Sequence, residues 1–330
     1  MTLFRWLTTA ALLLCTVVVV FGAYVRLSDA GLGCPDWPGC YGRLAVPTAA
    51  EHIAQAQQDF PDRPVEHAKA WKEMTHRYLA STLGLLILGL AVLSFRAGSP
   101  RVLPRVLLAL VIFQGMLGMW TVTWLLKPLA VTGHLLGGMS TLALLLWLWL
   151  DTRVAGVQSG HPGGVVAPAP SRLKFGAGVA LALLAGQIFL GGWTSSNYAA
   201  LACPDLPTCQ DRLWPELDVK EAFTLWRGLG QSYEYGVLDN RARVTIHHLH
   251  RVGALTVSTF LVVLGGWLWR QPRWKRHAQW ILGLLTAQAL LGASLVLFQL
   301  PLLLAAAHNA GAALLLLAVT HLNHRVWRSA

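Results

Sequence analysis

Eight long apolar runs, separated by polar or basic segments, dominate the sequence of 330 residues. A membrane-spanning helix needs about 20 mostly apolar residues. The pattern therefore predicts an all-α integral membrane protein with eight transmembrane helices. Their expected positions are roughly 4–25, 74–95, 104–124, 129–150, 174–194, 245–268, 278–298 and 302–323. The first run follows Arg5 as in a signal peptide, but no small-residue cleavage site precedes a soluble domain, so we expect a retained helix.

The composition excludes a soluble enzyme, because 55% of the residues are hydrophobic and only 12% are charged, against about 25% charged in soluble domains. The net charge of +11 suits either nucleic-acid binding or membrane orientation. With both termini in the cytoplasm, that side carries half of the 26 Lys and Arg residues and one acid, Asp151. This is the positive-inside pattern. It predicts a multi-pass protein of a bacterial-type inner membrane, surrounded by lipid and without a nucleic-acid partner.

The two halves of the chain repeat each other. GAYVRLSDAGLGCPDWPGC at 22–40 aligns without a gap with GGWTSSNYAALACPDLPTC at 191–209, and each of the three later helices has a match in the same order. Four spans per half give both halves one orientation, so the repeats are parallel. We therefore expect two pseudo-symmetric four-helix bundles, residues 1–154 and 174–330. A Gly/Pro-rich cytoplasmic linker at 155–173 joins them.

The repeat selects four histidines, one in the second and one in the fourth helix of each half: His76, His134, His250 and His308. Each is expected two to six residues past the outer start of its helix. Two imidazoles facing each other across a four-helix bundle are typical of axial haem ligation. Two alternatives are hydrogen bonds from the rings to backbone carbonyls and zinc, which needs three or four ligands at one point.

The other histidines are weaker candidates for haem ligands. His247 and His248 lie just before His250 and compete with it as the ligand of the sixth helix. The remaining six fall in loops or at helix ends, where we expect them to be solvated or interfacial. They are His52, His67, His161, His277, His321 and His324.

The halves differ beside the first histidine of each pair. Glu73 lies three residues before His76, whereas His247 occupies the matching place before His250. Residues three apart share a helix face, so Glu73 is a candidate proton donor beside the iron. The alternative is an interfacial helix cap.

Two further pairs of polar residues recur in both halves. Arg77 and Arg251 are candidate partners for haem propionates or, alternatively, for lipid phosphates. Gln114 and Gln288 either bond across helices or line a haem pocket.

Four of the five cysteines form two repeat-related pairs in the outer loops, Cys34/Cys40 and Cys203/Cys209. The outer side is oxidising, so we expect two disulfides within the loops. Whether Cys34–Cys40 is redox-active is open. The motif Cys-x-x-Cys of many thiol oxidoreductases is absent. Cys15 stands alone in the first span and is expected to be packing.

Nearly the whole chain resembles the haem A synthase family. The resemblance rests on eight spans in two halves, Glu-x-x-His-Arg at 73–77, His-Arg at 250–251, single histidines in the fourth and eighth spans, and the paired outer cysteines. It implies oxidation of the C8 methyl of haem O to a formyl group by successive hydroxylations, which makes haem A for terminal oxidases.

The resemblance also implies a division of labour between the halves. The first half would take the substrate haem O between His76 and His134, with Glu73 essential and the first disulfide close by. The second would hold haem b through His250 and His308. A haem O synthase (protohaem farnesyltransferase) is the natural partner by pathway. The sequence identifies neither the electron donor nor the oligomeric state, for which a homo-oligomer is one alternative. The competing functions are a bis-histidine dihaem electron-transfer cytochrome and a non-enzymatic haem transporter or chaperone.

Overall fold

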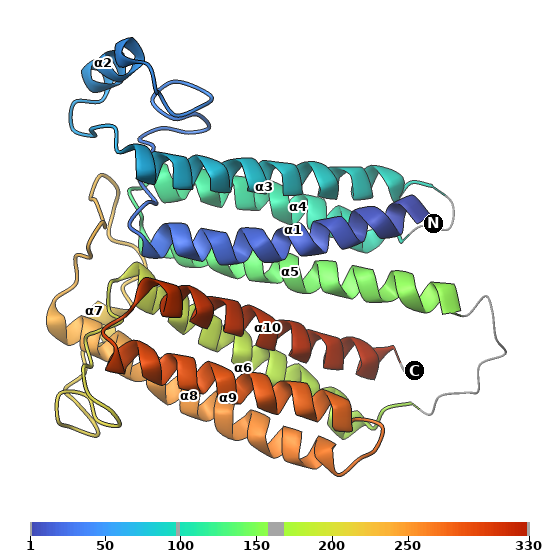
Figure 1. Ribbon diagram of the computed structural model, residues 1–330. Helices are drawn as coiled ribbons and strands as arrows, with labels where there is room; N and C mark the ends of the chain where they lie inside the picture. The colour runs from blue at the N-terminus through green and yellow to red at the C-terminus, as the bar shows by residue number, and fades with distance from the viewer. Residues whose placement is uncertain (1, 97–99, 158–167, 329–330) are drawn as a thin grey trace.

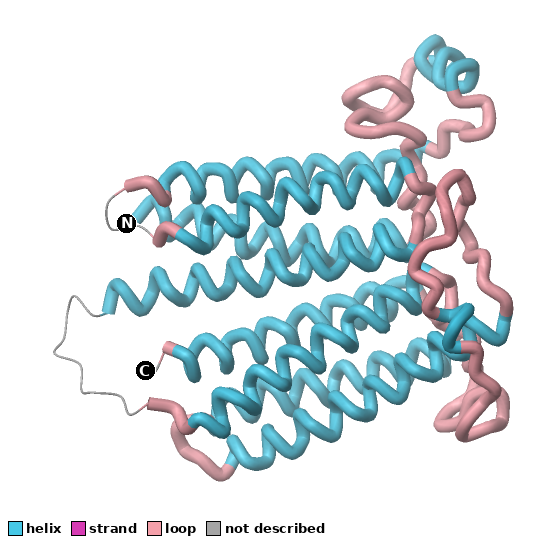
Figure 2. The backbone as a smooth tube through the Cα atoms, turned by 180° about the vertical axis from the view of Figure 1, so that it is seen from behind, coloured by secondary structure: helices cyan, strands magenta, loops and turns pink. Residues whose placement is uncertain are grey.

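The computed structural model describes residues 2–96, 100–157 and 168–328. Within these ranges helices are the only regular secondary structure (Figures 1 and 2), which confirms the all-α prediction. Eight of them are long and apolar enough to cross a membrane. They are α1 (Thr2–Leu27), α3 (His67–Leu93), α4 (Val102–Thr123), α5 (Pro128–Val157), α6 (Ser171–Ser196), α8 (Asn240–Trp269), α9 (Lys275–Leu297) and α10 (Leu302–Trp327). Two short helices, α2 (Ala50–Asp59) and α7 (Val219–Ala222), lie in the long loops at one end.

The spanning helices form two rings of four. In the first, α1, α3, α4 and α5 contact one another in cyclic order, and in the second α6, α8, α9 and α10 do the same. The rings meet where α1 packs on α10, α5 on α6 and α5 on α10. Exchanging each helix with its repeat counterpart leaves this set of principal contacts unchanged. The start of α1 and the end of α10 lie at the opposite end of the bundle from the long loops (Figure 1).

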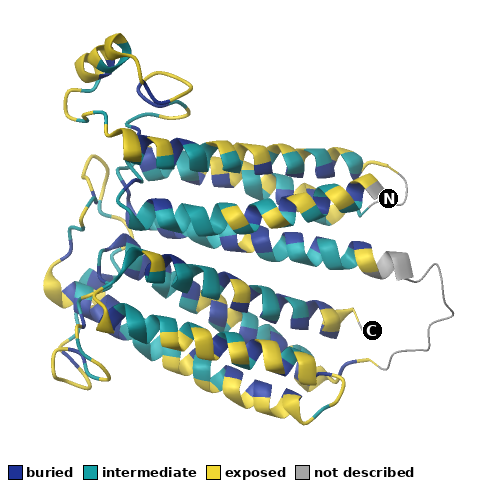
Figure 3. Cartoon of the chain, viewed as in Figure 1, coloured by how far each residue is buried: buried dark blue, intermediate teal, exposed yellow. Residues whose placement is uncertain are grey.

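The surface of the bundle is apolar. Large side chains such as Leu85, Phe175 and Leu255 are 68–76% exposed on the helices, and exposed residues run along the outer helix faces (Figure 3). The interior is a continuous apolar cluster that contains residues of both rings, including Leu148 and Leu322. An apolar exterior around an apolar core fits a lipid environment. The chain is a multi-pass membrane protein.

Two helices begin earlier than the apolar runs indicated. α3 starts at His67 instead of residue 74, and α8 starts at Asn240 instead of residue 245. The added turns are polar, so hydropathy does not reveal them, and Asp239 caps α8 by accepting from Ala242 N at 2.7 Å. His76 and His250 consequently lie nine and ten residues into their helices, and the expectation of two to six was wrong for both.

The linker is also shorter than its expected range of 155–173. α5 continues to Val157 and α6 already begins at Ser171. Residues 158–167, which make up most of that range, lie outside the described part of the chain, as does His161.

The two outer loops contain the same turn. In each, a disulfide is followed by an isolated antiparallel bridge to an arginine, Cys40 to Arg43 and Cys209 to Arg212. An aspartate two residues after the first cysteine accepts from two backbone amides: Asp36 from Tyr41 and Gly42, and Asp205 from Gln210 and Asp211. Both predicted disulfides are confirmed, and Cys15 is buried and unpaired.

At the end of the bundle that carries the long loops, the second loop reaches across to the first ring. Lys127 is 1% exposed; its ammonium donates to the carbonyl of Gly228 and lies 3.3 Å from the centroid of the Trp226 ring. Arg63 forms an ion pair with Glu234 at 3.1 Å.

At the opposite end of the bundle, a polar contact joins α5 to α10. Asp151 binds His324 Nε2 at 2.8 Å and Arg328 Nη2 at 2.7 Å. His324 has no exposed surface, so the expectation that it is solvated or interfacial was wrong. The reason is its partner, which comes from the other half of the chain and cannot be found by reading α10 alone.

Candidate functional site

The first pair of repeat-related histidines meets inside the first ring. His76 comes from α3 and His134 from α5, and their ring centroids are 6.4 Å apart with an angle of 79° between the planes. In the second ring, His250 of α8 and His308 of α10 are close enough to interact electrostatically. The structure thus brings the four histidines together as two pairs, one in each ring.

The imidazole ring of each of these four histidines lies against a glycine on a neighbouring helix. A Cβ placed on the glycine would lie 2.7–3.4 Å from Cε1 of the histidine. The pairs are Gly22 with His76, Gly118 with His134, Gly191 with His250 and Gly292 with His308. These glycines match within the repeat, yet their role was missed from the sequence. Their positions in the alignment were the available signal.

The two pairs fit axial ligation of a haem. Nδ1 of His76, His134 and His308 is buried without a hydrogen-bond partner, and all four histidine residues are half-buried. Since an imidazole nitrogen binds a metal such as zinc at about 2.0–2.1 Å, one metal ion between two such rings requires centroids roughly 6 Å apart. His76 and His134 meet this requirement. Among the described residues, no group of three or more His, Cys, Asp or Glu side chains could hold a metal ion, which disfavours the zinc alternative.

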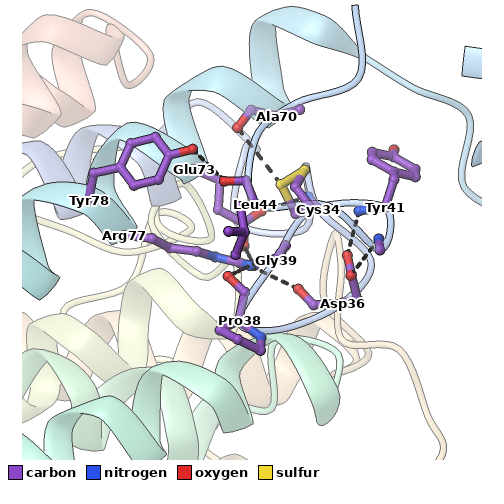
Figure 4. Close-up of a disulfide and its surroundings, with 12 residues drawn as sticks. Cys34, Asp36, Pro38, Gly39, Tyr41, Leu44, Ala70, Glu73, Arg77 and Tyr78 are labelled. Atoms are coloured by element: carbon purple, nitrogen blue, oxygen red, sulfur yellow. Dashed lines mark hydrogen bonds and ion pairs between the residues drawn. A yellow bond between two sulfur atoms is a disulfide. The ribbon is translucent and has the colours of Figure 1, made fainter. Parts of the chain in front are cut away.

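Glu73 is buried under the first outer loop (Figure 4). Its Oε2 accepts from Cys34 N at 2.8 Å, and its Oε1 is paired with the Arg77 guanidinium. It is therefore held by a loop and by its own helix. A buried carboxylate with fixed partners, one turn from His76, is a suitable group for holding and releasing a proton.

Arg77 links the same loop to α3 through hydrogen bonds. Besides pairing with Glu73, it donates from Nη1 to the carbonyls of Asp36 at 2.9 Å and Pro38 at 3.3 Å (Figure 4). Arg251 does the equivalent in the second half, donating to the carbonyls of Asp205, Thr208 and Cys203 at 2.7–2.8 Å. Both arginines thus bind loop carbonyls, and binding of haem propionates by them stays a prediction.

The two histidines that compete with His250 face the outer loop. His247 takes the place of Glu73: Cys203 N lies 3.2 Å from its Nδ1, and Arg251 Nε lies 3.2 Å from its Nε2. A neutral imidazole can accept at only one of these nitrogens. His248 packs edge-on against Trp214, with ring centroids 4.8 Å apart. Only His250 of the three is paired with His308, so it is the best candidate for a ligand on α8.

The glutamines of α4 and α9 bond across helices. Gln114 Nε2 donates to the carbonyl of His134 at 2.8 Å, and Gln288 Nε2 lies 3.4 Å from His308 Nε2. In both cases the amide oxygen presses against a glycine, Gly137 or Gly311. A third glutamine, Gln187 on α6, contacts His250. It was missed because the first half has no counterpart for it.

Comparison with known proteins gives one consistent result. The family described as COX15-CtaA, cytochrome oxidase assembly protein, matches residues 5–320. A haem A synthase of Shewanella oneidensis is 47% identical over 323 residues, which cover 98% of this chain and 96% of the relative. Haem A synthases of Caulobacter vibrioides and Methylobacterium radiotolerans are 30% and 29% identical and align with 98% and 96% of this chain.

Proposed function

The chain belongs to the COX15-CtaA family of cytochrome oxidase assembly proteins, and from this membership we infer that it is a haem A synthase. It is then an enzyme of haem biosynthesis that acts on a haem-type substrate within the membrane. The observation that carries the proposal is the pair His76 and His134 at 6.4 Å, with Glu73 one turn away on the same helix.

We propose that the two halves have different tasks. The first, residues 1–154, binds haem O between His76 and His134 and is the catalytic half. The second, residues 174–330, holds haem b between His250 and His308. The unpartnered Nδ1 atoms of His76, His134 and His308 and the glycine beside each of the four rings support this assignment. So does the difference between Glu73 and His247, because a carboxylate is needed only where a proton is consumed.

The reaction converts the C8 methyl of haem O to a formyl group. Each hydroxylation by O₂ takes two electrons and two protons and releases one water, and after two rounds the geminal diol loses water to give the aldehyde. A bound haem supplies iron for oxygen chemistry and for electron transfer. The protein positions the substrate through the two imidazoles. Glu73 delivers protons from Oε2, which the amide of Cys34 holds in place.

The topology follows from the charge pattern. Both termini are in the cytoplasm and the disulfide loops are outside, because the basic residues gather at the terminal end of the bundle. The natural partner is a haem O synthase, which supplies the farnesylated substrate in the same membrane. His250 and His308 would hold the haem b of the second half, which would supply electron transfer from a membrane donor when bound.

The test is haem extraction and mass analysis of the purified protein, with and without a co-expressed haem O synthase. We expect haem b alone without the synthase, and haem A or its hydroxylated precursor with it. Unmodified haems in both cases, together with a bis-histidine spectrum, would favour an electron-transfer cytochrome instead. Absence of any haem would overturn both functions.

A further inference from the structure

Gln187 on α6 approaches Nδ1 of His250, whereas Gln114 reaches the backbone carbonyl of His134 and Gln288 reaches Nε2 of His308. Gln187 Nε2 lies 3.1 Å from His250 Nδ1 and donates to the carbonyl of His250 at 3.0 Å. Nδ1 of His76, His134 and His308 is buried with no partner. In the described part of the chain, the four rings therefore differ in the group that fixes their orientation.

Gly253 makes room for this glutamine. It lies one turn after His250 on α8, and a Cβ at this position would be 2.4 Å from Gln187 Oε1 and 2.9 Å from Leu190 Cδ1. Any larger side chain at 253 would push the amide away from the ring. Gln187 and Gly253 thus form one arrangement that depends on both residues.

Beside His76, the counterpart of His250, the first half lacks both members of this arrangement; Gln114, seated against Gly137, reaches only the backbone carbonyl of His134. The repeat alignment places Val18 opposite Gln187 and Leu79 opposite Gly253. Valine offers no hydrogen-bonding group, and leucine fills the space that glycine leaves open. The two differences occur together, as expected if they serve one purpose.

We propose that Gln187, seated against Gly253, is a positioning residue that makes the haem of the second half a permanent cofactor, whereas Val18 and Leu79 leave the haem of the first half exchangeable. The inference rests on the proposed function, because a substrate must leave after each turnover and a cofactor must stay. It adds which residues make the haem of the second half permanent and leave the haem of the first half exchangeable.

The physical basis is the hydrogen bond to the ring nitrogen that does not bind metal. Such a bond fixes the orientation of the ligand and raises its basicity, and its loss typically costs about 10–100-fold in metal affinity. A ring bound to iron through Nε2 carries its proton on Nδ1. The amide then presents Oε1, which has no partner in the present orientation. A half-turn of the carboxamide exchanges its donor and its acceptor, which places Oε1 opposite the proton on Nδ1 and gives up the bond from Nε2 to the His250 carbonyl.

The test uses full-length protein in detergent, loaded with haem b and lacking haem O, in a His76→Ala background so that only the second half holds haem. Gln187→Met keeps the size of the side chain but removes the hydrogen bond. Gln187→Val with Gly253→Leu copies the arrangement of the first half. In both we expect transfer of haem to apomyoglobin to be about 10–100-fold faster.

The midpoint potential of the haem provides a second readout. A less basic ligand favours ferrous iron, so the potential should rise by about 59 mV for each tenfold loss of preference for ferric iron. Gly186→Ala is the matched control, because it adds a methyl group on α6 beside Gln187 where no atom lies within 4 Å. It should change neither quantity.

The reciprocal variant places the arrangement in the first half. Val18→Gln with Leu79→Gly, in a His250→Ala background, should slow the loss of haem from the first half. Unchanged transfer rates and potentials in Gln187→Met and in both double variants would overturn the inference. A wild-type protein that binds no haem would overturn the proposed function instead, so the two failures are distinguishable.

Discussion

The backbone amide of Cys34 donates a 2.8 Å hydrogen bond to Oε2 of Glu73, a residue 39 positions later. The amide of Cys203 points in the same way at His247 Nδ1, at 3.2 Å. One loop geometry thus holds a carboxylate in the first half and an imidazole in the second. It is the disulfide loop, together with the helix, that sets where the Glu73 carboxylate lies.

Glu73→Gln should separate haem binding from chemistry. The amide still accepts from Cys34 N but cannot deliver a proton, and loss of such a group costs about 10²–10⁴-fold in rate. We expect normal haem content, with haem O or a hydroxylated intermediate in place of haem A when extracted haems are analysed by mass. Glu66→Gln, an exposed change nearby on the outer side, is the control. Wild-type yields of haem A in Glu73→Gln would remove Glu73 from the mechanism.

Removing the two disulfides should have unequal effects on activity. Each closes a loop with a sequence separation of 6, and loop-closure entropy predicts a similar loss of about 2 kcal/mol for either. Cys34→Ser with Cys40→Ser also frees the amide that holds Glu73, so haem A yield should fall further than in Cys203→Ser with Cys209→Ser. Thermal unfolding and haem A yield, measured side by side, give the comparison. Equal yields at equal stability would contradict it.

Gly22→Ala should disturb the first histidine pair. The new methyl group would lie 2.7 Å from His76 Cε1, and overpacking of this kind costs about 1–3 kcal/mol. We expect a lower unfolding temperature and weaker binding of haem O, seen as less haem O in the purified protein. Gly84→Ala adds the same methyl group where nothing lies within 4 Å and should be neutral. A Gly22→Ala protein with unchanged haem O content would mean that the ring can shift at no cost.

The disulfide loop of the second half should lose stability, and become more accessible to protease, at low pH. A hydrogen bond from the Thr208 hydroxyl and further bonds from backbone amides lower the pKa of Asp205 from 3.8 to about 2. Because the folded pKa lies below the unfolded one, this stabilisation is fully present above about pH 4 and is lost as the pH falls towards 2. Cleavage of the loop by pepsin, relative to an unstructured peptide, should rise over that range. Asp205→Asn should be cleaved readily at every pH; a flat wild-type profile would argue against the effect.

The sequence predicted most of what hydropathy and the repeat encode. Eight spans and two disulfides are confirmed, because both depend on composition and local spacing. The starts of α3 and α8 were missed since their first turns are polar and lie under the outer loops. A hydropathy window measures the lipid-facing part of a helix, not its whole length.

Contacts between helices were harder to predict. The burial of His324 depends on Asp151 from the other half, 173 residues away, and no periodicity in α10 indicates that partner. The roles of Gln187 and Gly253 depend on the rotation of α6 against α8. In contrast, the pairing of His76 with His134 was predictable, because the repeat marked both residues before any packing was known.

The contacts between the two rings have the form of a two-fold interface, in which α1 on α10 is the counterpart of α6 on α5. Two identical four-helix chains could associate in this way, but then every substitution would appear on both sides of the interface. One continuous polypeptide removes that restriction. It allows a glutamate and a histidine, Glu73 and His247, to occupy matching places in a single molecule, so that specialisation of one side need not be copied by the other.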